Sequence, residues 1–239
     1  MKRYLSVFEM ITRSSIYKVL LILVGMVAVE LTVFYLTMSN PAGVNIEEYI
    51  DQSHYSLIFK IAYMLITIAI VLPGMNIGSV QSYTLQRLRI KEKSVFWLQA
   101  LYNMFAYVLL CGVQLMVLLF SCVMYQKNLP EIAVWSNQTL FLAFYRNAFM
   151  HSILPLEDVF GWLVLVFLVV GTAVTSAYFT AQMRRGKFVW EIGVVIGAVL
   201  IDFPKDFGNE IAVMVIAAVI VAVSLLCRWT KKWEGGNKT

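Results

Sequence analysis

The fold is decided by a run of 25 residues, Val159–Met183, which reads VFGWLVLVFLVVGTAVTSAYFTAQM. The run contains no charged residue, and the basic cluster Arg184-Arg185-Gly186-Lys187 closes it. A helix of about 20 apolar residues is long enough to cross the roughly 30 Å hydrocarbon core of a bilayer. The sequence therefore predicts a membrane-spanning helix here.

The composition extends this prediction to the whole chain. Hydrophobic residues make up 60% of the 239 residues, charged residues only 14%, and the mean hydropathy is +0.76. Soluble domains contain about 45–50% apolar and about 25% charged residues. We therefore expect an all-α, polytopic membrane protein in which residues 1–239 form a single transmembrane domain.

Apolar runs separated by charges or breakers predict six transmembrane helices. The fifth run is short: the 14 residues from Phe188 to Ile201 would rise about 21 Å as a helix, less than the bilayer core. A short re-entrant element before the last span accounts for this shortfall. The spans are expected at about residues 17–38, 61–80, 97–125, 159–183, 188–203 and 211–227.

Three segments are not expected to cross the membrane. Residues 1–16 have apolar side chains at Tyr4, Phe8 and Ile11 with charges between them, which favours an amphipathic interfacial helix over a plain basic start that only fixes orientation. Residues 127–158 mix aromatic and charged residues and are expected to form an outer interfacial segment. Residues 81–96 carry the densest charge run and are expected to be cytoplasmic.

The distribution of basic residues orients the chain. With both termini in the cytoplasm, 15 of the 19 Lys and Arg residues fall on the inner side, as the positive-inside rule requires. We expect a multi-pass protein of the bacterial inner (cytoplasmic) membrane. Basic residues facing the anionic inner leaflet explain the net charge of +5 without a nucleic-acid partner.

Sequence motifs for chemistry are missing from the chain. The Gly186-Lys187 pair is followed by Phe188, where a nucleotide-binding loop needs Ser or Thr to hold Mg²⁺. The sequence also lacks HExxH and GxSxG patterns. We therefore expect no enzyme activity, no catalytic residue, and no cofactor or metal bound by this chain.

Glu30 is the only carboxylate well inside a predicted span. A charge there costs about 2.5–3.5 kcal/mol on insertion scales, so Glu30 is expected to face the bundle interior. It either belongs to a translocation path or subunit interface, or it is a neutral structural residue. Pro73 predicts a kink beside the small-residue pair Gly74 and Gly78, which suits close helix packing.

Arg146 and His151 lie five residues apart in the outer segment. They could line an exit for a polar substrate, or they could simply mark the headgroup boundary.

A stretch between the second and third spans mixes charged and apolar residues, so a short helix there could dock into a groove on a soluble partner. The alternative is a basic anchor at the inner boundary. The candidate contact residues are Tyr83, Gln86, Arg87, Leu88, Arg89, Lys91 and Glu92.

The layout, together with residues 83–93 (YTLQRLRIKEK), Phe96 and residues 99–103 (QALYN), resembles the ABC-2 type permeases, the small six-span membrane subunits of bacterial ATP-binding-cassette exporters. The resemblance implies a pair of permease subunits, identical or related, in the lipid bilayer, bound to a cytoplasmic ATPase subunit that holds ATP and Mg²⁺. Residues 81–96 would contain the coupling helix. Two alternatives remain from the residues alone: a stand-alone secondary transporter, and a membrane scaffold or immunity-type protein without transport.

Overall fold

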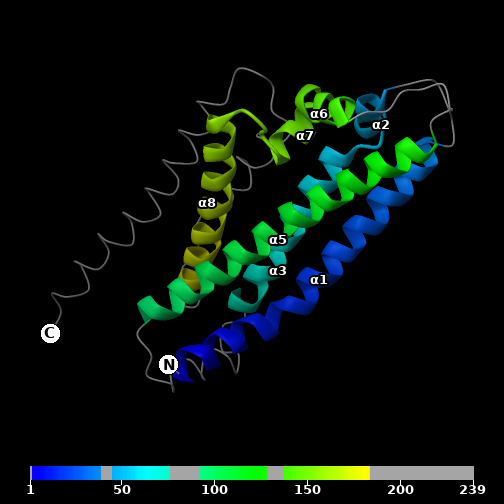
Figure 1. The fold of residues 1–239 in the computed structure, drawn as a ribbon. Helices are drawn as coiled ribbons and strands as arrows, with labels where there is room; N and C mark the ends of the chain where they lie inside the picture. The colour runs from blue at the N-terminus through cyan, green and yellow to red at the C-terminus, as the bar shows by residue number, and fades with distance from the viewer. Residues whose placement is uncertain (1, 39–44, 76–91, 129–136, 184–239) are drawn as a thin grey trace, which may run out of the picture.

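The computed structural model describes residues 2–38, 45–75, 92–128 and 137–183. Regular structure within these ranges is entirely helical. Four long helices form a bundle, and three short ones gather at one of its ends, which we call the cap end (Figure 1). The helices are α1 (Lys2–Met38), α2 (Ile46–Gln52), α3 (Tyr55–Met75), α5 (Glu92–Lys127), α6 (Asn137–Arg146), α7 (Ala148–Ile153) and α8 (Val159–Met183).

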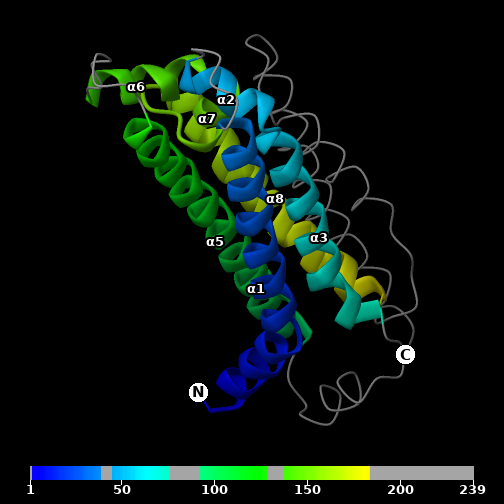
Figure 2. The ribbon, with the colours of Figure 1, turned by 90° about the vertical axis from the view of Figure 1, so that its right-hand side faces the viewer.

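Each of the four long helices is long and apolar enough to cross a bilayer. The prediction of a helical membrane protein is confirmed at this level. Four of the six predicted spans fall on α1, α3, α5 and α8, whereas the ranges 188–203 and 211–227 lie outside the described residues. Figure 2 shows α1 running between α5 and α3, and these two helices are its main neighbours.

Among the predicted spans, the fourth agrees best with the structure, because α8 covers Val159–Met183 as expected. At the N-terminus the structure differs from the prediction, because α1 runs from Lys2 to Met38 without a break between an interfacial helix and the first span. No proline occurs in these residues and the first glycine is Gly25, so no strong helix breaker separates the amphipathic start from the apolar run.

Helix α3 begins at Tyr55, six residues before the predicted start of the second span. The charge on Lys60 suggested a boundary, yet Lys60 lies inside the helix. The boundary is set instead by His54, whose φ of 53° ends α2 and redirects the chain. The His54 carbonyl then accepts hydrogen bonds from the backbone N–H groups of Leu57 (3.0 Å) and Ile58 (3.1 Å), which form the first turn of α3.

Residues 137–153 form α6 and α7, which are 10 and 6 residues long. Neither helix is long enough to cross a bilayer. Asn147 links this segment to α2: its side-chain oxygen accepts the Met150 N–H (3.0 Å), and its amide nitrogen donates to Asp51 Oδ1 (2.9 Å). Because Asn147 caps α7 and binds α2 at the same time, the short helices form one connected cap.

Helix α8 is buried around its whole circumference from Gly171 to Thr180. A helix segment that is buried on every side lies in the interior of the protein. Its most extensive neighbour among the described helices is α5. Near the end of the bundle opposite the cap, Ala177 is fully buried and belongs to a cluster with Ala100 and Phe96 of α5.

Replacing Ala177 by Leu is expected to lower the free energy of unfolding by about 1–3 kcal/mol, because the larger side chain has to displace packed neighbours. Thermal unfolding of the purified chain in detergent measures the effect. Val166→Leu is the matched control on the same helix, since Val166 is 53% exposed and adds its methylene group outside the core. Equal stability of the two variants would contradict the close packing of α8 around Ala177.

Candidate functional site

Five polar residues lie on one face of α5, and all five are buried. Their spacings of four and seven residues keep them within an arc of about 80° at 3.6 residues per turn. We call this face, together with the polar side chains that it meets on α1, α3 and α8, the polar seam. The α5 residues are Gln99, Asn103, Tyr107, Gln114 and Ser121.

The part of the seam nearest the cap is built around Glu30 of α1. Glu30 has no solvent-exposed surface, and its polar neighbour across the helix interface is Gln114 of α5. Tyr55 of α3 lies close enough to interact electrostatically with Glu30. The Tyr55 hydroxyl and the Ser121 hydroxyl are 2.7 Å apart and share a hydrogen bond. Three spans thus contribute polar groups to this cap-end layer.

The environment of Glu30 favours its neutral, protonated form. Both carboxyl oxygens are buried, and neither has a hydrogen-bond partner among the described residues. A charged carboxylate without a partner in a medium of low dielectric constant is strongly disfavoured. Gln114, although adjacent, is not within hydrogen-bond geometry of the carboxyl group. The two carboxyl oxygens of Glu30 therefore have unused hydrogen-bonding capacity.

The middle layer of the seam is fully connected. Tyr63 of α3 and Tyr107 of α5 stack with ring centroids 4.8 Å apart and an interplanar angle of 18°. The Tyr63 hydroxyl is 2.6 Å from Thr172 Oγ1 of α8, and Thr67 Oγ1 of α3 is 2.9 Å from the Tyr107 hydroxyl. This layer joins α3, α5 and α8 through side-chain hydrogen bonds.

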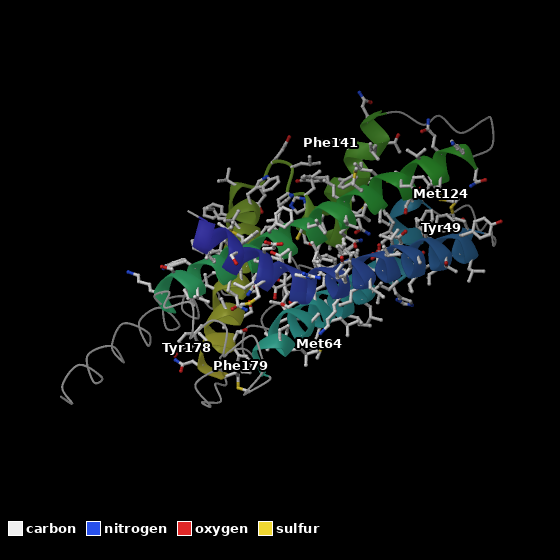
Figure 3. The ribbon with its side chains drawn as sticks, turned by 90° about the horizontal axis from the view of Figure 1, so that it is seen from below. Tyr49, Met64, Met124, Phe141, Tyr178 and Phe179 are labelled. Carbon is white, nitrogen blue, oxygen red and sulfur yellow. The ribbon has the colours of Figure 1, made fainter. Side chains whose placement is uncertain are left out.

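Towards the end opposite the cap, Asn103 of α5 donates to Ser176 Oγ (2.8 Å) and to the Ala173 carbonyl (3.4 Å) of α8. Asn103 Oδ1 and Thr175 Oγ1 are buried without a hydrogen-bond partner among the described residues. Figure 3 labels Tyr49 of α2 and Met124 of α5 towards the cap, and Tyr178 and Phe179 of α8 towards the other end of the bundle.

Polar atoms with unused hydrogen-bonding capacity are concentrated at the two ends of the seam, around Glu30 and around Asn103, whereas the middle layer is saturated. Buried polar groups are nearly always hydrogen-bonded, and those that are not require an explanation. The stacked rings of Tyr63 and Tyr107 lie between these two groups of unpartnered atoms.

The structure places some of the residues predicted from sequence and leaves others undescribed. Glu30 is fully buried in the cap-end layer of the seam, so its carboxyl group faces the bundle interior. Pro73 lies in the last turn of α3, where Gly74 follows it. Glu92 is the first residue of α5. Gly78 and the other six coupling residues, from Tyr83 to Lys91, lie outside the described residues.

Arg146 and His151 have different surroundings. Arg146 is exposed at the end of α6, whereas His151 is 6% exposed in α7 and contacts the ring of Tyr145 at 5.9 Å. The two residues therefore do not present one common solvent-facing surface.

No family model, no curated protein and no solved structure matches this chain. The polar seam therefore carries the functional argument.

Measurements of the free energy of unfolding can show whether the buried pair of Glu30 and Gln114 stabilises the fold. Each buried polar group without a partner costs about 1–3 kcal/mol, so the double variant Glu30→Leu/Gln114→Leu is expected to raise the free energy of unfolding by at least about 1 kcal/mol. Glu48→Leu is the control, because Glu48 is exposed on α2. A double variant less stable than the parent in thermal unfolding would show that the pair stabilises the fold.

Proposed function

We propose that this chain is the membrane-spanning permease subunit of an ATP-binding-cassette exporter, which forms the translocation pathway and couples to a separate ATPase subunit. The observation that carries the proposal is the polar seam. Polar residues inside spans are costly and characteristically line substrate pathways. The seam runs between α1, α3, α5 and α8 and contains unused hydrogen-bonding capacity at both ends.

The seam suits alternating access. In that mechanism a central barrier separates two half-pathways, and rigid-body movement of packed helices opens one half at a time. The stacked Tyr63 and Tyr107 are the barrier, and the groups around Glu30 and Asn103 serve the two half-pathways. The barrier opens when α3 and α5 move apart, because its two rings come from these two helices.

The same two helices flank the coupling segment. The end of α3 at Met75 and the start of α5 at Glu92 lie at the end of the bundle opposite the cap, where α1 also begins (Figure 1). A force applied to residues 81–96 acts directly on α3 and α5. The hydrogen bond between Thr67 of α3 and Tyr107 of α5 then transmits this movement to the stacked tyrosine rings that form the barrier. An ATPase bound to this segment therefore has a short mechanical route to the seam.

Charge reversal in the coupling segment tests the partner. Affinity purification in mild detergent is expected to recover a nucleotide-binding protein with the parent chain and to lose it with the triple variant Arg87→Glu/Arg89→Glu/Lys91→Glu, because charge reversal removes the electrostatic complementarity to the partner. The matched control is Lys127→Glu/Arg146→Glu, which reverses basic residues at the cap end. Retention of the ATPase by the triple variant would rule out this coupling surface.

Glu30 specifically favours a second function, proton-coupled secondary transport, because an intramembrane carboxyl group that can exchange a proton is a common element of such carriers. Liposomes that contain the purified chain alone distinguish the two functions. With an acidic exterior and a pH-sensitive dye inside, the permease is expected to admit protons no faster than protein-free liposomes. Rapid acidification that is abolished by Glu30→Gln would favour the secondary transporter instead.

A further inference from the structure

A small polar pocket lies at the cap end, where the chain turns from α2 into α3. Its volume is about 180 Å³, and its charged and polar lining comes from Asp51, His54, Ser56 and Lys60. The pocket therefore offers a carboxylate, an imidazole, a hydroxyl and an ammonium group within one small space.

Lys60 is the cation of this site. It lies five residues inside α3, a helix whose apolar length is sufficient to span a bilayer. Lysine side chains near the end of a span extend towards the headgroup region, where phosphodiester groups are the abundant anions. The pocket is thus placed at headgroup depth, whichever side of the membrane the cap faces.

Asp51 provides the opposite charge at the same pocket. Asn147 Nδ2 donates a hydrogen bond to its Oδ1 at 2.9 Å, which fixes the carboxylate in place. Beside it, His54 adopts a φ of 53°, a conformation that is uncommon for residues other than glycine. A cation and a fixed anion on one small pocket match a zwitterion that carries a phosphate and an ammonium group.

An apolar stripe on α3 continues directly from the pocket. Leu57, which lines the pocket, is 59% exposed, and it is followed on the same face by Ile61 at 51% and Leu65 at 46%. Met64, labelled in Figure 3, is also exposed along this helix at 42%. Steps of four residues place these side chains one above another along the span. Such a stripe suits an acyl chain that descends from the headgroup.

From these features we propose that the pocket between α2 and α3 binds a phospholipid with a phosphoethanolamine headgroup. Lys60 pairs with the phosphate, Asp51 pairs with the ammonium group, and an acyl chain lies along the stripe from Leu57. The charges select a zwitterionic headgroup over a purely anionic one, because a glycerol headgroup leaves the Asp51 carboxylate without a cation.

Lipid adducts of the full purified chain can be quantified by native mass spectrometry with phosphatidylethanolamine and phosphatidylglycerol as probes. Lys60→Gln is expected to weaken binding of both lipids about fivefold, since one lysine near phosphate groups contributes about 1 kcal/mol, which corresponds to that factor. Asp51→Asn is expected to remove the preference for phosphatidylethanolamine while leaving phosphatidylglycerol binding unchanged. Lys127→Gln, a lysine at the end of α5, is the matched control and is expected to change neither.

Unchanged phosphatidylethanolamine binding in Lys60→Gln, or an undiminished headgroup preference in Asp51→Asn, would overturn the proposal. The two variants are independent, so misfolding of one leaves the other informative. Competition with soluble O-phosphoethanolamine distinguishes a membrane lipid from free phosphoethanolamine as the ligand of the pocket. Poor competition by this compound supports a lipid, whereas displacement of the lipid at equal concentration would show that the stripe contributes nothing and would also overturn the proposal.

Discussion

Hydrocarbon offers no hydrogen-bond partner, and every polar group in a span of this chain has to find its partner inside the bundle or remain without one. This constraint explains why the described structure is helical, because a helix satisfies its own backbone. It also explains the local behaviour of hydroxyl groups in α8. Thr172, Ser176 and Thr180 each return a hydrogen bond to a backbone carbonyl three or four residues earlier. Each hydroxyl thereby has an acceptor for its proton within its own helix, and Thr172 and Ser176 also bond to α3 and α5.

The same constraint separates the surfaces of the helices. Exposed faces of α1 and α5 carry large apolar side chains such as Leu21, Val24, Phe105 and Met116, which face an apolar solvent at no cost. Polar residues are collected on the opposite faces. The bundle is therefore more polar inside than outside along the seam. Helix association in a bilayer rests on packing and on hydrogen bonds such as those of the middle layer, because lipid removes the hydrophobic driving force.

Much of this fold could be predicted from sequence, because charge-free apolar runs determine where spans lie. The bounds of α8 follow from its composition alone. The start of α3 could not be predicted in this way, because Lys60 resembles a boundary and the true turn depends on the φ of His54. A charge within an apolar span identified Glu30. Its neighbour Gln114 carries no charge, and their contact depends on the register between α1 and α5, which the sequence does not specify.

The polar residues of α5 follow a spacing that could have been recognised in the sequence. Gln99, Asn103, Tyr107, Gln114 and Ser121 repeat at helical spacing within an otherwise apolar span. Searching for polar rather than apolar periodicity would have identified the face. Its meaning still requires the structure, because only the partners on α3 and α8 show that Tyr107 is saturated while Asn103 retains an acceptor without a partner.

Tyr55 connects the cap to the interior of the bundle. It lines the pocket beside Lys60, and its hydroxyl reaches Ser121 in the cap-end layer, within electrostatic range of Glu30. It is fully buried and also contacts Phe34 of α1 edge-on at 6.1 Å. A close-packed residue transmits displacement instead of absorbing it. An occupant that shifts the first turn of α3 therefore changes the surroundings of Glu30 through Tyr55, so the headgroup region and the seam are mechanically joined at one side chain.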